Sequence, residues 1–234
     1  MSGRTIELTG IGPVTLVKYA RSRSLRLSVT ANGVRVSMPK WTPYSAGQSF
    51  VIKHIDWIQQ ELAKQTVPIL TAGQHIGKLH TLRFEQVSNH QTVSSWVTGT
   101  EIVVRVKPNE TSTDTAAQKR AYSASIRALK REAERLLPPR LRSLAATHGC
   151  TYNDVHIKQL KRRWGSCDSN KTITLNLFLM ELPWDHIDYV ILHELAHTTE
   201  MNHGPNFWRT LTAMNPQART LSKQLRSRQP TIGA

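Results

Sequence analysis

The sequence predicts an α+β protein, with a small β-rich N-terminal domain over residues 1–110 and a second, mixed domain over residues 111–234. Three patterns lead to this division. Short runs in the first hundred residues alternate apolar and polar side chains, which is typical of half-buried strands. Residues 116–137 place apolar side chains at helical spacing, and residues 183–199 form another segment with helical character.

The N-terminal domain is expected to combine strands with one helix. Residues 14–20 are apolar and β-branched, and residues 25–29 alternate apolar with polar side chains. Asn32 and Gly33 predict a type I′ hairpin turn between two strands. Apolar residues near helical spacing predict a helix over residues 45–65. Further strands are expected over residues 34–36, 79–87, 92–97 and 102–106.

The second domain is expected to combine helices with two strands. Pro138 and Pro139 should kink or break its first helix, because proline removes a backbone donor and clashes with the preceding turn. Gly149 can end the helix after it resumes. Strands are expected over residues 155–160 and 172–180, around a loop. The expected helices cover residues 116–137, 139–148 and 183–199, and two short helices begin at Pro205 and Pro216.

Composition excludes several classes of protein. The chain has 234 residues, of which 39% are hydrophobic, so it is too apolar to be wholly disordered. It has no run of about 18 apolar residues, the minimum for a membrane span. The first 13 residues lack the apolar core of a secretion signal, and two cysteines cannot form a disulfide scaffold. We therefore expect a cytoplasmic protein without membrane contact.

The net charge of +15 suggests an anionic partner, but the charge is unevenly distributed. Residues 116–163 hold twelve basic and three acidic residues, whereas residues 164–208 hold one basic and six acidic residues. Residues 1–70 carry a net charge of +6, and residues 209–234 carry +5. One acidic segment therefore lies within a basic chain.

The acidic segment contains the pattern His193-Glu194-Leu195-Ala196-His197. Two histidines four residues apart share one helix face, so both imidazoles can bind one metal ion. Zinc held in this way lowers the pKa of a bound water molecule, and a neighbouring Glu accepts the proton. The pattern therefore predicts His193 and His197 as ligands of Zn²⁺ and Glu194 as a general base.

A catalytic zinc ion usually has three protein ligands, and His203 is the candidate for the third. In a continuous helix His203 would lie about 15 Å along the axis from His193, so the helix must end before it. Asn202 tolerates the left-handed conformation, Gly204 is permissive, and Pro205 can start a new helix. The alternative is that His203 only caps a helix turn.

Two further residues share the metal-binding face of the expected helix. Glu200 could orient a ligand imidazole, replace the third ligand, or be a solvated residue at the helix end. Tyr189 lies one turn before His193 and could donate a hydrogen bond to the transition state or pack in the core.

Four segments resemble the YgjP-like metal-dependent hydrolases: Lys161–Cys167, Ile173–Leu177, Ile187–His197 and Asn202–Trp208. These hydrolases are zincin-type metallopeptidases, similar to the SprT-like and WLM proteases that act on DNA-bound or crosslinked proteins. The resemblance implies a zincin-like metallopeptidase domain with an active-site helix over residues 111–234, after a β-rich N-terminal region. It also implies a protein or peptide substrate, Glu194 as general base, and Zn²⁺ bound by His193, His197 and His203.

The loop expected over residues 161–171 could be catalytic or structural. The arginine pair 162–163 could stabilise an oxyanion, or the loop could be structural, with Trp164 packed and Gly165 in a turn. Cys167 could be a metal ligand, a nucleophile or a small buried thiol. In zincins an edge strand along the active-site helix often binds substrate backbone, and residues 172–178 are expected to be that strand.

Basic residues gather in two segments that could contact nucleic acid or form solvated faces. These are the helix residues Lys119, Arg120, Arg127, Lys130, Arg131, Arg135, Arg140 and Arg142, and the tail from Arg219 to Arg228. Three functions fit the sequence: a zinc peptidase, with DNA-associated proteins as one substrate class; a nucleic-acid-binding protein with a structural metal site; and a zinc hydrolase of a non-peptide substrate. The first is favoured, because a structural site usually has four protein ligands.

Overall fold

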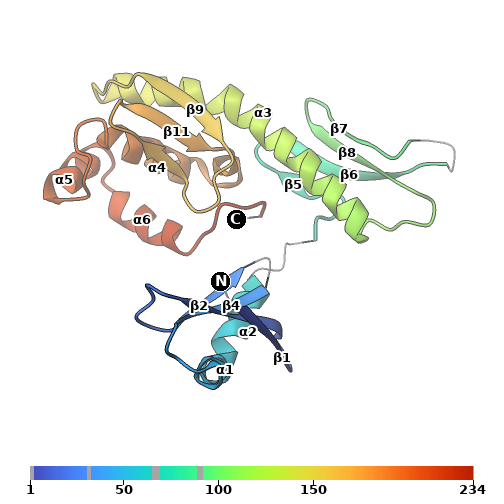
Figure 1. The fold of residues 1–234 in the computed structure, drawn as a ribbon. Coiled ribbons are helices and arrows are strands. Elements are labelled where there is room, and N and C mark those ends of the chain that lie inside the picture. Colours follow the sequence, from blue (N-terminus) through green and yellow to red (C-terminus); the bar gives the residue numbers. More distant parts are fainter. Residues whose placement is uncertain (1–2, 31–32, 65–68, 89–91, 234) are drawn as a thin grey trace. The chain divides into compact units, whose positions relative to one another are not determined.

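The computed structural model of the chain describes residues 3–30, 33–64, 69–88 and 92–233 (Figure 1). It divides into two compact units, Met1–Val67 and Pro68–Ala234. The combination of helices and several sheets confirms the α+β prediction. The units divide between Val67 and Pro68, whereas the sequence analysis placed its domain boundary between residues 110 and 111.

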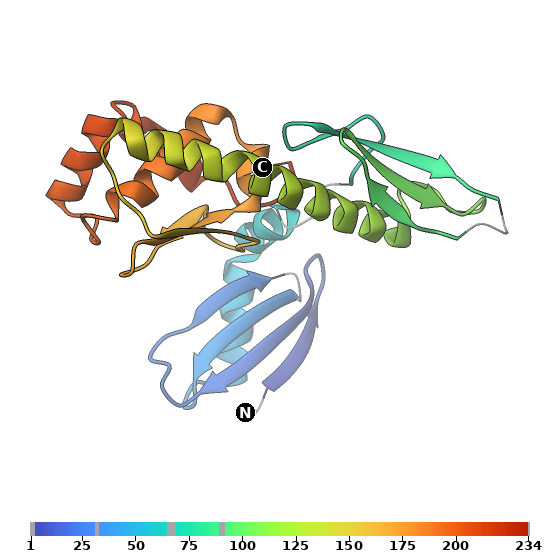
Figure 2. The same cartoon turned by 90° about the horizontal axis from the view of Figure 1, so that it is seen from above.

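The first unit is a four-stranded sheet with two helices on one face (Figure 2). The strand order is β1-β2-β4-β3, in which β2 and β4 are parallel and the other neighbours are antiparallel. Apolar side chains of the strands form a core with Val51 and Ile58 of the helices. The elements are β1 (Gly3–Leu8), β2 (Gly12–Tyr19), β3 (Arg26–Thr30), β4 (Gly33–Pro39), α1 (Tyr44–Lys53) and α2 (Ile55–Lys64).

The structure adds detail to the expectations for this unit. Strands β3 and β4 are antiparallel and pair Thr30 with Gly33, as in a hairpin, while Asn32 of the predicted turn lies outside the described residues. Strand β1 was not expected from the sequence. The single helix expected after β4 is two helices, because the chain leaves helical geometry at His54, whose Nδ1 lies 2.8 Å from the carbonyl oxygen of Phe50.

The second unit begins with a four-stranded sheet that packs on the long helix α3 (Figure 1). The strand order is β5-β6-β8-β7, with β6 and β8 parallel. Leu82, Ile102 and Val104 of this sheet share one apolar core with Ala121 and Ala128 of α3. This shared core explains why the boundary between the units precedes the sheet. The elements are β5 (His75–Ile76), β6 (His80–Gln86), β7 (Ser95–Val97), β8 (Glu101–Val106) and α3 (Thr115–Thr147).

Helix α3 runs without interruption, so of the two effects predicted for Pro138 and Pro139, a kink or a break, the break is wrong. The prolines leave the carbonyl groups of Glu134 and Arg135 without their helical donors. Both of these residues are exposed, so water can bond to their carbonyl groups. The helix continues because apolar residues before and after the prolines are fully buried in one core, namely Leu137 and Leu141.

The rest of the second unit contains a three-stranded sheet of order β10-β11-β9, and its helices. The strand expected over residues 172–180 ends at Asn176, whose side chain accepts a hydrogen bond from the backbone N–H of Phe178 and starts a 3₁₀ helix. The loop expected before it contains strand β10. The elements are β9 (Asp154–Lys158), β10 (Gly165–Cys167), β11 (Thr172–Asn176), η1 (Leu177–Glu181), α4 (Trp184–Ala196), α5 (Pro205–Met214) and α6 (Ala218–Arg226). Among the described residues, none of the helices has the length and apolar character of a membrane span.

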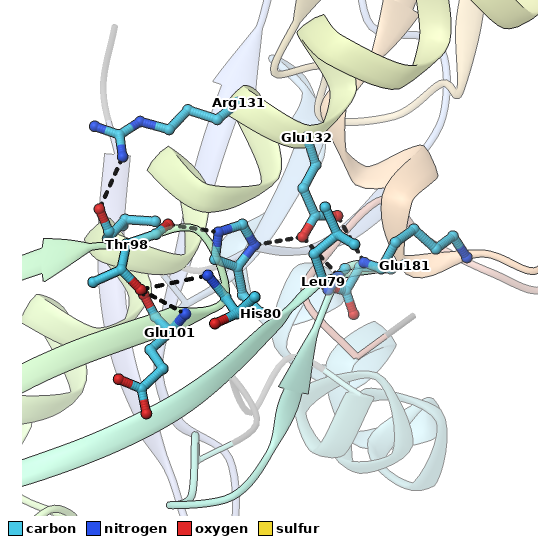
Figure 3. A network of polar contacts seen from close by, with 11 residues as sticks. Leu79, His80, Thr98, Glu101, Arg131, Glu132 and Glu181 are labelled. Atoms are coloured by element: carbon cyan, nitrogen blue, oxygen red, sulfur yellow. Dashed lines mark hydrogen bonds and ion pairs between the residues drawn. The ribbon is translucent and has the colours of Figure 1, made fainter.

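A buried carboxylate joins α3 to the turn between β5 and β6 (Figure 3). Glu132 is 2% exposed and accepts hydrogen bonds from the backbone N–H groups of Lys78 (2.7 Å) and Leu79 (3.0 Å). Its Oε1 also contacts Nδ1 of the buried His80. Glu181 of η1 accepts another backbone N–H of the same turn at 2.9 Å. Two carboxylates thus replace water as acceptors for this turn.

We expect Glu132→Gln to lower the free energy of unfolding by about 2 kcal/mol, because the new amide group would face buried backbone donors and leave them unsatisfied. Urea unfolding followed by tryptophan fluorescence measures this change. Glu134→Gln is the matched control: it lies in the same helix, is exposed, and should change stability by less than about 0.5 kcal/mol. Equal effects of the two substitutions would contradict the role given to Glu132.

Candidate metal centre

Three histidines converge at the end of α4. His193 lies in the last turn of α4, His197 is the residue that ends it, and His203 lies in the connection to α5. Their Nε2 atoms are 3.3 Å apart between His193 and His197, 3.2 Å between His197 and His203, and 3.0 Å between His203 and His193. In the described part of the chain, these three side chains form a group that could hold a metal ion.

The triangle of nitrogen atoms has the size that a metal ion requires. Two nitrogens bound to one zinc ion at about 2.05 Å with tetrahedral angles lie about 3.3 Å apart. The observed separations are 3.0 to 3.3 Å. Imidazole nitrogen is also a preferred ligand of zinc and of other divalent transition metals. The donor atoms therefore fit a divalent metal in both spacing and chemistry.

The chain turns sharply after His197, and this turn returns His203 to α4. The hydroxyl groups of Thr198 and Thr199 donate hydrogen bonds to carbonyl groups three residues earlier, at 2.7 and 3.1 Å. These side-chain donors add to the backbone N–H groups of Thr198, Thr199 and Glu200, which donate to the same carbonyl groups. The predicted end of the helix before His203 is confirmed.

The turn uses a different backbone conformation from the one expected. Among the described residues other than glycine, Lys171 has a positive φ and Asn202 does not. Gly204 is extended, with φ −75° and ψ −175°, so the expected left-handed turn at these residues is wrong. Pro205 is the first residue of α5, as predicted, since its fixed φ suits the start of a helix.

Two neighbouring groups lie at the far nitrogen atoms of the imidazoles. Nδ1 of His197 lies 3.0 Å from the backbone carbonyl oxygen of Glu200, so an Nδ1–H group can donate there and leave the Nε2 lone pair for a metal. Glu200 therefore orients His197 through its backbone. Tyr189 is buried in the core, one of the two expected roles, and its hydroxyl lies 3.4 Å from Nδ1 of His193.

Phe207 of α5 contacts all three imidazoles, and the sequence analysis gave it no role. Its ring is fully buried and stacks on His197 at 4.6 Å between centroids. The ring centroid also lies 4.9 Å from that of His193 and 4.7 Å from that of His203. This position depends on the turn between α4 and α5. The sequence shows only that an aromatic residue lies close to the third histidine, and it does not predict the ring contacts.

Burial keeps His193 and His197 in the form that binds metal. It lowers the pKa of His193 to about 3, and His197 and His203 add to this effect as neighbouring cationic groups. Burial also lowers the pKa of His197. Both imidazoles are therefore neutral at pH 7, and a neutral imidazole is the species that coordinates a metal ion.

Glu194 is buried beneath strand β10. It is 5% exposed, and burial raises its pKa to about 8, against the opposing effect of Arg163. A Cβ atom added to Gly165 would lie 2.7 Å from Oε1 of Glu194, so only glycine leaves room for this carboxylate. Gly165 lies within a strand, and the expectation that it forms a turn is wrong.

Asn176 holds the loop that leads into β10. It is fully buried, and its Nδ2 donates to the carbonyl oxygens of Leu160 and Arg163, both at 2.8 Å. Its backbone N–H donates to the carbonyl oxygen of Trp164 at 2.9 Å. Asn176 therefore positions Gly165 against the carboxylate below it. In the sequence, the signal for this role was a polar residue, Asn176, within the apolar run of residues 173–180.

Strand β10 is the edge strand beside α4, so the expectation that residues 172–178 form that edge is wrong. Strand β11 lies in the centre of the sheet, between β10 and β9. A pocket of about 240 Å³ opens beside His193, Glu194 and Gly165. The other residues that line it are Arg163, Trp164, Tyr189, Val190, Ser222, Leu225 and Arg226.

Cys167 is a protonated thiol at neutral pH. Burial raises its pKa to about 11, and the carboxylates of Glu194 and Asp168 add to the increase. Metal binding and nucleophilic attack both require a thiolate. This environment favours the expected small buried thiol over a ligand or a nucleophile.

The fold and this site can be compared with known proteins. A family model described as YgjP-like, metallopeptidase domain, matches residues 23–228. The chain belongs to the YgjP-like family. It is therefore a metal-dependent peptidase, and the resemblance drawn from its motifs is confirmed. The matched residues of this YgjP-like protein, 23–228, include the positions of the three histidines and Glu194.

Two solved structures are similar to part of the chain. The metallopeptidase zymogen abylysin of Pyrococcus abyssi is 25% identical, with a TM-score of 0.34, over 37% of this chain and 89% of that chain. The metallopeptidase zymogen jannalysin of Methanocaldococcus jannaschii is 22% identical, with a TM-score of 0.33, over 37% of this chain and 89% of that chain. No curated protein matches the sequence.

We expect Gly165→Ala to lower peptide hydrolysis by this YgjP-like protein at least tenfold, because the new methyl group would displace Glu194, and displacements of about 1 Å can cost a hundredfold in rate. Cleavage of a mixed peptide library measures the activity, and the metal content should not change. Gly99→Ala is the control, since a Cβ there meets no atom within 4 Å. Full activity of Gly165→Ala would contradict the inference that a side chain at this position displaces Glu194.

Proposed function

We propose that the protein hydrolyses peptide bonds with a zinc ion held by His193, His197 and His203 and with Glu194 as the general base. One observation carries the proposal: three Nε2 atoms lie 3.0 to 3.3 Å apart, next to a buried carboxylate in the same helix. Three protein ligands leave one coordination position open, as in catalytic zinc sites, whereas structural sites usually have four ligands.

The role of Glu194 follows from its position and its surroundings. A zinc ion, when bound, supplies Lewis acidity that activates water and polarises a carbonyl group. Glu194 accepts a proton from the attacking water at a carboxylate oxygen and then gives it to the leaving amide nitrogen. Burial raises the pKa of Glu194, so once a bound cation has released its proton, the carboxylate is a stronger base than an exposed Glu beside the same cation would be.

The surroundings of the histidines suit an extended peptide substrate. Strand β10 pairs with β11 along one side and is at the edge of its sheet, so a peptide can add to it as another strand. The pocket beside Glu194 can hold a neighbouring substrate side chain, with apolar contacts from Trp164, Val190 and Leu225. Arg163 and Arg226 add positive charge to this pocket.

Arg163 is the candidate for stabilising negative charge in the transition state. It lines the same pocket as His193 and Glu194, and its charge acts on the carboxylate of Glu194. A guanidinium group in this place can donate hydrogen bonds to the oxygen of the carbonyl group that is attacked. Arg162 does not line this pocket.

DNA-associated proteins are a narrower substrate class within this proposal, and the basic helix α3 offers limited support for DNA contact. Several of its basic side chains bond within the chain. Arg127 and Arg131 donate to the carbonyl oxygens of Ser95 (2.9 Å) and Val97 (3.0 Å). Three more basic residues of α3 form ion pairs, which are Arg120–Glu110, Lys130–Glu134 and Arg140–Asp188.

We expect Glu194→Gln to lower the rate of peptide cleavage by about a hundredfold to ten-thousandfold, the range that general-base catalysis contributes. Zinc content per chain should stay at one, because the three histidines are unchanged. Cleavage of a peptide library and elemental analysis of the purified protein measure the two quantities. Cleavage by Glu194→Gln at the rate of the unchanged protein would rule out the proposed base.

The same assays separate this proposal from its alternatives. If the protein is a zinc peptidase, His203→Ala should lose both zinc and peptide cleavage. If its metal site is structural, Glu194→Gln should leave its nucleic-acid binding unchanged. Hydrolysis of esters without hydrolysis of peptides would favour a non-peptide substrate. Adding single-stranded DNA to the cleavage assay tests whether DNA-associated proteins are the substrates. If they are, the DNA should raise the rate of cleavage.

Zinc binding at pH 7 should release a proton from Glu194. Without metal, its pKa of about 8 keeps it mostly protonated at pH 7, and a nearby dication lowers that pKa. His193 releases no proton, because its lowered pKa already leaves it neutral. Titration calorimetry in buffers of different ionisation enthalpy counts the protons. We expect Glu194→Gln to release about one proton fewer per zinc ion, and equal release would contradict the raised pKa.

A further inference from the structure

The sheet of the first unit has one covered face and one polar face. Alternate residues of its central strands, such as Leu16 and Val36, are buried in the core with α1 and α2. The residues between them, such as Arg35 and Ser37, alternate to the opposite face. Register pairs Ser28 with Arg35 and Arg26 with Ser37 on that face. The polar face therefore carries arginine and hydroxyl groups side by side.

A pocket of about 460 Å³ opens at one end of this face. It is formed by the connection between β2 and β3, by the residues of these strands that flank the connection, and by one residue of β4. No carboxylate lines it, because the described acidic residues of the unit, Glu7, Asp56 and Glu61, lie elsewhere. Its lining consists of three arginines, three serines and one tyrosine: Arg21, Arg23, Arg26, Ser22, Ser24, Ser37 and Tyr19.

The arginines of this pocket differ from those of α3 in their partners. Within the described residues, the guanidinium groups of Arg21, Arg23 and Arg26 have no ion pair, and all three side chains are exposed. On α3, by contrast, five of the eight basic residues bond within the chain. Three arginines without an ion pair among the described residues therefore line one pocket.

Tyr19 adds an aromatic surface beside the arginines. Arg35 donates a hydrogen bond to the hydroxyl of Tyr19, and its guanidinium carbon lies 5.6 Å from the centre of the ring. This contact holds the ring at the edge of the pocket. Sheet faces that present aromatic rings among cationic side chains bind single-stranded nucleic acid, since bases stack on the rings while arginines contact phosphates.

We propose that this pocket binds the phosphodiester backbone of single-stranded nucleic acid. Arg21, Arg23 and Arg26 contact phosphate groups, and the serine hydroxyl groups donate further hydrogen bonds to phosphate oxygens. Tyr19 provides a stacking surface for a base. The proposal does not depend on the peptidase chemistry, because all these residues belong to the first unit.

The test compares two triple variants of the full chain that lose the same amount of charge. Arg21→Gln, Arg23→Gln and Arg26→Gln remove the cations of the pocket. Lys119→Gln, Arg135→Gln and Arg142→Gln remove three exposed cations of α3 that have no ion pair among the described residues. Fluorescence anisotropy with short labelled DNA and RNA single strands, and with a DNA duplex, measures the affinities.

We expect the pocket variant to bind single strands at least tenfold more weakly, and the α3 variant to change affinity less than threefold. Three lost phosphate contacts should also make the slope of log affinity against log salt less negative by about 2, at about 0.7 for each contact. Tyr19→Leu should weaken single-strand binding severalfold without changing that slope. Circular dichroism melting checks that each variant is folded.

Three results would overturn the proposal: equal losses in both triple variants, unchanged binding in the pocket variant, or binding to the duplex at least as tight as to the single strands. Binding to vesicles that contain anionic lipid, without binding to either oligonucleotide, would instead identify a membrane surface as the partner and would also overturn it. Peptide cleavage without added nucleic acid should be unchanged in the pocket variant.

Discussion

The convergence of three imidazole nitrogens within 3.3 Å of one another constrains the rest of the second unit. The rise of a helix alone would separate His193 from His203 by about 15 Å, so the chain has to leave α4 and return. Threonine hydroxyl groups bond to the last carbonyl groups of the helix, and α5 then brings Phe207 against the rings. Because packing fixes the rings in advance, a metal ion would need little rearrangement of the chain.

The carboxylate beside the histidines is held by a different part of the chain. Residues 160–176 form a loop and two strands, and the buried amide of Asn176 ties the loop to β11. This arrangement brings Gly165 against Glu194 and excludes water from one side of the carboxylate. The proposed metal binding and proton transfer thus depend on two separate segments that meet at α4.

Local patterns in the sequence were sufficient for the fold class, for the shared helix face of His193 and His197, and for the end of the helix before His203. They could not identify Gly165 or Phe207, because both act through close approach between segments distant in the chain or across a turn. The local rule for proline failed at Pro138 because burial of the apolar face of α3 outweighs the lost hydrogen bonds.

The long helix α3 also decides which part of the chain can be expected to fold by itself. One stretch of its surface is covered by the β5–β8 sheet, and the rest packs with the elements that carry the histidines. A fragment starting at residue 111 would include the three histidines and Glu194 but would leave alanines such as Ala121 and Ala128 open to water. The smallest soluble fragment should therefore begin ahead of β5, about forty residues before the helix itself.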